Sequence, residues 1–112
     1  MAIQVTGFFP NPNNDSYIKD AVITLNVNQV PMGKLDVTCN LNVEKEITNP
    51  VGETSTQLVM VSSFIMTNID RTSLTFTPTG DPYEDLLNGV QDYLISQFET
   101  ENPDLTFSVY GA

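Results

Sequence analysis

The chain of 112 residues contains no histidine, no tryptophan and a single cysteine. Histidine is the commonest general base and the commonest transition-metal ligand, so its absence removes much ordinary enzyme chemistry. Cys39 has no second cysteine for an intrachain disulfide. It also has no histidine with which to form a zinc site or a Cys–His nucleophile pair. We therefore expect no metal site built from this chain alone.

Phosphate-binding loops are missing as well. Neither G-x-x-x-x-G-K-[ST] nor G-x-G-x-x-G occurs in the sequence. Paired carboxylates remain as a hydrolytic possibility, and Glu84 and Asp85 are adjacent. They are expected at the exposed start of a helix, where carboxylates favour the positive helix end. We predict that the protein is not an enzyme, has no catalytic residue and needs no cofactor.

Basic residues are scarce, with 4 lysines and arginines against 14 acidic residues and a formal net charge of -10. A chain this poor in bases is unsuited to replacing the counterions of nucleic acid or to docking on anionic lipid. The charge suits a basic protein partner, or solubility alone. Residues 79–112 hold no base and these acids: Asp81, Glu84, Asp85, Asp92, Glu99, Glu101 and Asp104.

Targeting segments are not apparent. The first residues lack a charged stretch followed by an apolar run, as in a signal peptide. No apolar run approaches the roughly 20 residues that span a bilayer. We expect synthesis in the cytoplasm without a signal peptide, no membrane partner and no direct sequence-specific contact with nucleic acid.

One stretch, residues 81–98, has a sustained helical period. Asp81 suits the N-cap, Pro82 the first helical position and Glu84 the acid of a capping box. The spacing predicts one apolar face that packs on a sheet. That face is expected to contain Tyr83, Leu87, Val90 and Leu94, with Leu86 and Phe98 on its border.

The other segments have the alternation of strands. Residues 35–43 alternate without error, which predicts a strand with Cys39 buried as a small hydrophobic residue. With residues 21–30 and the turn Pro31-Met32-Gly33 they predict a long hairpin over residues 21–44. Shorter strands are expected within residues 3–9, 74–77 and 105–109.

Residues 58–66 are apolar on both sides. They predict either a central strand covered on two faces, or a strand with one face toward the core and one toward a partner. Asn49-Pro50 and Gly52 predict a loop over residues 47–55. The Asn- and Pro-rich residues 11–15 offer oxygen ligands without EF-hand spacing, so a turn is the simpler interpretation.

These elements predict a single domain, residues 1–112, of the α+β class. We expect a mostly antiparallel β-meander, or a small β-sandwich, of about six strands with one helix packed on it. An acidic, Asn- and Thr-rich chain with a meander, a hairpin over residues 21–44 and one helix resembles small virion proteins of tailed bacteriophages. Those are tail, neck or capsid-associated decoration subunits.

The resemblance lies in general architecture and carries no motif residue. It implies a structural subunit of an assembled virion that contacts copies of itself and other structural proteins, with residues 31–33 as a contact arm. The alternative is a small acidic adaptor or inhibitor that binds a basic protein surface. Strand faces poor in lysine favour association, because they lack the charge that blocks edge pairing.

Four apolar or aromatic side chains are candidates for the centre of an interface. Phe8 and Phe9 stand beside the Asn- and Pro-rich turn, Met32 at the predicted hairpin tip and Tyr110 near the C-terminus. Aromatic residues and methionine are enriched in the cores of interfaces. For Phe8 and Phe9 the alternative is that one of them closes the protein core.

Overall fold

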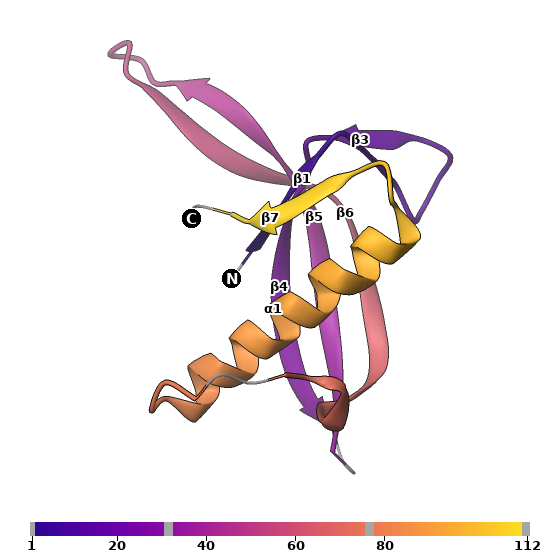
Figure 1. Ribbon diagram of the computed structural model, residues 1–112. Coiled ribbons are helices and arrows are strands. Elements are labelled where there is room, and N and C mark those ends of the chain that lie inside the picture. The colour runs from indigo at the N-terminus through magenta and orange to yellow at the C-terminus, as the bar shows by residue number, and fades with distance from the viewer. Residues whose placement is uncertain (1, 31–32, 76–77, 111–112) are drawn as a thin grey trace.

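The computed structural model describes residues 2–30, 33–75 and 78–110. Its strands form a five-stranded antiparallel sheet in the order β6-β5-β4-β1-β7 and a two-stranded sheet β2-β3 (Figure 1). With one α-helix across the larger sheet, the predicted α+β class is confirmed. The elements are β1 (Ala2–Thr6), β2 (Phe8–Pro10), β3 (Tyr17–Lys19), β4 (Val22–Val30), β5 (Lys34–Thr48), β6 (Thr54–Asp70), the 3-10 helix η1 (Arg71–Ser73), α1 (Pro82–Glu101) and β7 (Thr106–Val109).

The hairpin of β4 and β5 is the centre of the sheet, as its alternating sequence predicts. Val22 lies opposite Asn42 and Val30 opposite Lys34, so the two strands pair over the whole length of β4. One face of β5 is fully buried and consists of Leu35, Val37, Cys39 and Leu41. Because strand residues alternate between faces, this face meets the helix and the other carries polar residues.

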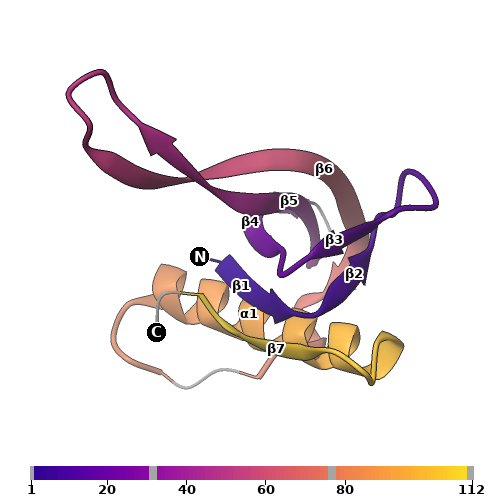
Figure 2. The same cartoon turned by 90° about the horizontal axis from the view of Figure 1, so that it is seen from above.

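Helix α1 lies across one face of the sheet, and Figure 2 shows it below the curved strands. The Asp81 side chain accepts hydrogen bonds from the backbone N–H groups of Tyr83 and Glu84, at 3.1 and 3.3 Å. The helix ends at Glu101, and the N–H of the C-cap residue Asn102 donates to Phe98 O at 2.8 Å. The predicted N-cap and the predicted helix are therefore confirmed. No helix among the described residues has the length and apolar character needed to cross a bilayer.

The buried face of α1 differs from the predicted one. Its apolar core residues are four positions apart: Leu86, Val90, Leu94 and Phe98. Val90 and Leu94 were predicted correctly, but Tyr83 is 67% exposed and Leu87 is half-buried. The helix is rotated relative to the prediction because Phe98 packs on aromatic residues of the strands. Residues four positions apart share a helix face, so Leu94, Val90 and Leu86 are buried with it.

Phe98 is the point at which four elements meet. Its ring lies 5.9 Å from the ring of Phe9 on β2 and 5.8 Å from that of Phe107 on β7. Phe64 on β6 is 6.2 Å away. Edge-to-face and tilted pairs at these distances add to the stabilisation from buried area. The cluster holds the end of α1 against both sheets.

A sharp corner separates β1 from β2 and β3 from β4, so the strand predicted within residues 3–9 is broken in two. Gly7 has φ +114 and Asp20 has φ +51. The two residues face each other, since Gly7 N–H donates to Asp20 Oδ1 at 2.9 Å and Asp20 N–H donates to Gly7 O at 2.8 Å. The corner lets β2 and β3 leave the main sheet as a separate ribbon.

Two further predictions change. Residues 49–53 alone form the predicted loop over residues 47–55, because β5 runs to Thr48 and β6 starts at Thr54. The strand predicted over residues 74–77 is wrong for Leu74 and Thr75, which have irregular backbone after η1, while residues 76 and 77 lie outside the described part. Leu74 is buried, so its side chain packs in the core although its backbone pairs with no strand.

The Cys39 thiol is expected to stay unreactive in the folded protein. Burial raises its pKa from 9.0 to about 12. A raised pKa favours the neutral form, so this contribution to stability is present below pH 9 and is lost as the pH rises toward 12. A thiol reagent at about pH 8 should label Cys39 at the rate of unfolding. Rapid labelling without denaturant would contradict the buried position.

Candidate interaction surface

The hairpin of β5 and β6 extends beyond the sheet as a two-stranded ribbon (Figures 1 and 2). We call residues 44–61 the arm. Pairing of β5 with β4 ends at Asn42, whereas pairing with β6 continues to Thr48 opposite Thr54. Every residue of the arm is exposed. The described part of the chain therefore leaves the arm uncovered on both faces.

The tip of the arm has a defined geometry. The Asn49 side-chain oxygen accepts hydrogen bonds from Val51 N–H at 3.1 Å and Glu53 N–H at 2.9 Å. Gly52 supplies a positive φ of +85, and its N–H donates to Asn49 O at 3.0 Å. This Asn-centred turn presents Val51 at the end of the arm with 80% of its surface exposed.

Apolar side chains continue along the arm. Met60 is 60% exposed, and four other arm residues are also large, apolar and exposed: Ile47, Leu58, Val59 and Val61. A two-stranded hairpin is marginally stable alone in water. Exposed apolar patches of this kind mark surfaces that bind other molecules. The arm is the strongest candidate interaction surface of the described residues.

This arm is a different hairpin from the predicted contact arm. The turn with Gly33 begins β5, while the arm contains the end of β5, so the two lie at opposite ends of that strand. The candidate Met32 lies outside the described residues. Sequence analysis missed the arm because Asn49-Pro50 and Gly52 suggested a long loop. The sequence signal for the arm was the run of uncharged residues over 54–61, which is rich in β-branched side chains.

Strand β6 is an edge strand of the five-stranded sheet. The interpretation of residues 58–66 as a central strand is therefore wrong, because β6 pairs with β5 on one side and with no described strand on its other side. No charged residue occurs from Thr54 to Ile69. Natural edge strands usually carry lysine, proline or bulges that prevent pairing with other chains. Here only irregularities in the register are present, between Leu41 and Asn42 and between Leu35 and Val37 of β5.

The turn between β2 and β3 contacts the middle of β6. Asn13 Nδ2 donates to Ser63 O at 3.0 Å, and Ser62 Oγ donates to Asn11 Oδ1 at 2.9 Å. Asn11 Oδ1 also accepts from the N–H of Asn13, so these amides are used within the turn and on β6. The described residues contain no group of three or more His, Cys, Asp or Glu side chains placed to hold a metal.

The predicted interface residues do not form one surface. Phe8 is 60% exposed on β2, whereas Phe9, its neighbour on the opposite side of the strand, is 6% exposed in the aromatic cluster. Phe9 therefore closes the core, as the alternative held. Tyr110 is half-buried, and its hydroxyl donates to Glu44 Oε1 at 2.9 Å.

The hydrogen bond from Tyr110 ties the base of the arm to the end of the chain. Because the Glu44 carboxylate accepts a hydrogen bond from the neutral phenol, it raises the pKa of Tyr110 above its ordinary value. Tyr110 N–H also donates to Ala2 O at 3.0 Å, which extends the pairing of β7 with β1. The two bonds position Glu44 where the arm leaves the sheet.

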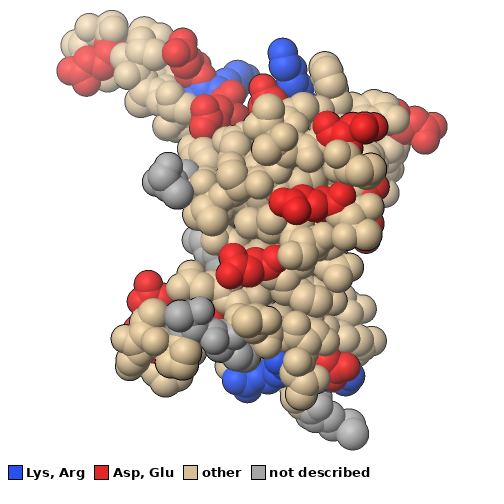
Figure 3. Space-filling view, viewed as in Figure 1, with Lys and Arg blue, Asp and Glu red and all other residues tan. Residues whose placement is uncertain are grey.

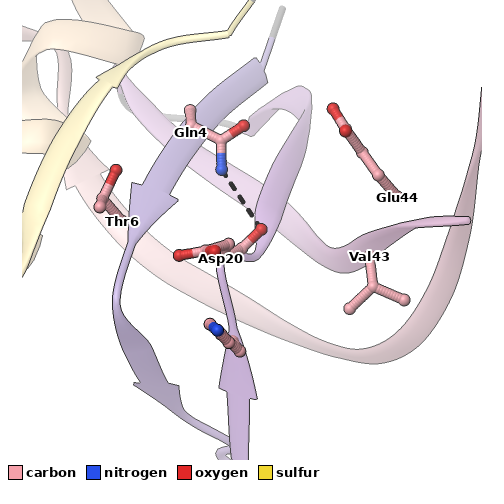
Figure 4. A pocket seen from close by; sticks show the side chains of 6 residues that line it. Gln4, Thr6, Asp20, Val43 and Glu44 are labelled. Carbon is pink, nitrogen blue, oxygen red and sulfur yellow. Dashed lines mark hydrogen bonds between the residues drawn. The ribbon is translucent and has the colours of Figure 1, made fainter.

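A polar cleft of about 530 Å³ lies at the base of the arm (Figure 4). Gln4 and Asp20 stand on one side and Val43 and Glu44 on the other, with Gln4 Nε2 donating to Asp20 O at 3.2 Å. Lys19 adds a positive charge. This mixture of polar groups suits the side chains of a protein partner better than one small ligand.

An apolar groove of about 490 Å³ lies beside the β2–β3 turn. Its walls come from three parts of the fold, namely the β2–β3 ribbon with its turn, β6 and the end of α1. The apolar lining residues are Phe9, Pro10, Pro12, Phe64, Met66 and Phe98.

Acidic side chains are spread over the face that bears α1, whereas basic side chains occur near the two ends of this view (Figure 3). The ion pair that forms among the described residues joins Lys34 to Asp70 and involves no residue of α1. The helix carries acids in its first turn and no base in its last turn. This face therefore repels anions and attracts basic surfaces.

Comparison with protein-family models, curated proteins and solved structures gives no match. The predicted likeness to virion proteins therefore stays a prediction. The arm, the uncharged β6 edge and the acidic face of α1 are the observations from which function is inferred.

Proposed function

We propose that the protein is a structural subunit of a larger assembly and that the arm is its main contact element. The observation that carries the proposal is an extended ribbon, residues 44–61, with every residue exposed and apolar side chains along it. Such a ribbon gains stability when a partner covers its apolar surface. A role in assembly supplies that partner.

A virion is the proposed assembly, because the sequence resembles small virion proteins of tailed bacteriophages in its composition and its order of elements. Copies of this chain and other structural proteins of the particle are the proposed partners. The outer face of β4 and β5 supports a packing role, because it carries short, uncharged polar side chains. Among them are Thr24, Asn26, Thr38 and Asn40.

A second candidate function is a small acidic adaptor or inhibitor that binds a basic protein. It is favoured by the exposed carboxylates of α1, which include Glu84, Asp92 and Glu99. A basic partner would approach these carboxylates, and the arm would contribute little. The two functions therefore use different surfaces and are separable by mutation.

Shortening the arm tests the first function. Val43 lies directly opposite Val59, so residues 44–58 can be replaced by Asn-Gly, which favours a tight hairpin turn. We expect the shortened protein to keep its fold, because the removed residues belong to no part of the core. It should lose the self-association of the wild-type chain. Light scattering after size-exclusion chromatography and thermal melting measure the two effects.

The matched control neutralises the other surface. A triple variant, Glu84→Gln, Asp92→Asn and Glu99→Gln, should self-associate as the wild type does. A wild-type chain that stays monomeric at every concentration, and gains mass only with a basic protein, would instead favour the adaptor. In that case the triple variant, and not the shortened arm, should abolish binding.

A further inference from the structure

The two edges of the arm differ in charge. The β5 edge carries Glu44, Lys45 and Glu46, whereas the β6 edge has no charged residue over residues 54–61. Beyond Asn42 no described strand pairs with the outer side of β5, and none pairs with the outer side of β6. Both edges thus present backbone N–H and C=O groups, but only the β6 edge lacks the side chains that discourage pairing.

The open part of the β6 edge has a definite length. It begins at Thr54 after the tip, and it ends where Asn11 and Asn13 hydrogen-bond to Ser62 and Ser63. The register irregularity between Leu41 and Asn42 leaves Val61 of β6 without a partner on β5, so regular pairing of the ribbon ends at the same place. Residues 54–61 remain, which at about 3.4 Å per residue extend roughly 27 Å.

We infer that residues 54–61 of β6 pair antiparallel with the same segment of a second copy, which joins two arms into one four-stranded sheet. This inference rests on the proposed function and names the partner that the arm contacts. The pairing satisfies the open backbone groups of both copies at once. It also extends two marginal ribbons to one sheet of four strands, and a sheet with an apolar face needs three or more strands to be stable alone.

Repulsion between two acidic copies is smallest at this edge. With a net charge of -10, two copies repel each other wherever acids approach. In a β5-β6-β6-β5 arrangement the charged β5 strands are three strand spacings apart, or about 14 Å. That separation exceeds the screening length of about 8 Å at physiological salt. The β6 edge is therefore the part of the arm on which two such acidic chains can meet.

Symmetry places the axis at one residue. The two-fold axis of an antiparallel pair is perpendicular to the sheet, so residues that lie opposite must point to the same face. The axis then passes through a residue near the middle of the segment. We place it at Leu58, so that the apolar side chains of Leu58 in the two copies lie opposite each other. This register also sets Gln57 opposite Val59, Thr56 opposite Met60 and Ser55 opposite Val61.

Disulfide trapping tests the register. Opposed Cα atoms in an antiparallel pair are about 4.5–5.5 Å apart, within the roughly 4.4–6.8 Å of a disulfide. Leu58→Cys should therefore cross-link two copies under mild oxidation. The native Cys39 is fully buried and does not compete. Non-reducing electrophoresis follows the dimer over time.

Two control variants place the thiol elsewhere on the same arm. Thr54→Cys lies four residues from the axis, so its two copies are about 27 Å apart in the paired sheet. Glu46→Cys lies on the β5 strand, away from the new interface. All three positions are exposed, so we expect random collisions alone to cross-link them at similar rates. We expect Leu58→Cys to cross-link about tenfold faster or more, because pairing raises the local thiol concentration.

A charge variant measures the same interface in the reduced protein. Thr56→Lys puts a lysine opposite Glu46 in its own arm, which preserves the ribbon, but places that lysine at the open edge. We expect the dissociation constant of the dimer, measured by sedimentation, to rise about tenfold or more. Thr48→Lys, the control on β5, should leave it unchanged.

The outcomes separate the pairing from the proposed function. A wild-type chain that associates while all three cysteine variants cross-link equally overturns the β6 pairing and keeps the assembly role. Faster cross-linking at Glu46→Cys also overturns it and assigns contact to the β5 edge. A monomeric wild-type chain with equal cross-linking overturns both the pairing and self-assembly.

Discussion

Replacing Leu94 by aspartate is expected to unfold the protein, whereas the same change at Leu87 leaves it folded. Leu94 is 0% exposed at the centre of the buried face of α1. An unpaired carboxylate at this position costs several kcal/mol, against a total stability of about 5–15 kcal/mol for a domain of this kind. Circular dichroism and thermal melting should show loss of the cooperative transition.

Leu87 is the matched control because the residue type, the substitution and the helix are the same. It is half-buried and lines an open hollow with Ala2 and Val109, where water solvates a new carboxylate. We expect Leu87→Asp to lower the free energy of unfolding by about 1–2 kcal/mol. Equal damage from the two substitutions would contradict the buried face formed by Leu86, Val90, Leu94 and Phe98.

Gly7→Ala is expected to have the second largest effect. Gly7 has φ +114, which residues with a Cβ rarely adopt. A Cβ would also lie 2.6 Å from Leu105 Cδ2. Strain of this kind costs about 1–3 kcal/mol, which corresponds to a fall in melting temperature of roughly 5–15 °C. Differential scanning calorimetry measures the fall.

Gly52→Ala provides the comparison. Gly52 also has a positive φ, +85, but nothing lies within 4 Å of a Cβ at the tip of the arm. Its substitution strains an exposed turn without displacing a core side chain, so the melting temperature should change less. A smaller loss at Gly7 than at Gly52 would show that the corner adapts easily.

The corner at Gly7 also bears on function. It directs β2 and β3 out of the main sheet, and their turn supplies the amides of Asn11 and Asn13 that bind β6. Those contacts, at Ser62 and Ser63, mark where the open part of the β6 edge ends. A change at Gly7 is therefore expected to alter the edge as well as stability, although the arm lies far from it in sequence.

Local chemistry was sufficient to predict several elements. The unbroken alternation of residues 35–43 predicted the buried face of β5, including Cys39, because one residue in two faces the core of a half-buried strand. Asp81 and Pro82 predicted the start of α1, because capping depends on the first turn alone. The class, one helix on antiparallel strands, followed from the order of these elements.

Tertiary structure decided the features that depend on residues far apart in sequence. The helix face was set by Phe98, whose partners Phe9 and Phe107 come from β2 and β7. Phe9 and Phe8 are indistinguishable in the sequence, and only the side of β2 that meets the helix separates them. The arm was set by where pairing of β4 with β5 stops, at Asn42, while β6 continues to the tip. Pairing limits of this kind arise from register between strands, which no local pattern contains.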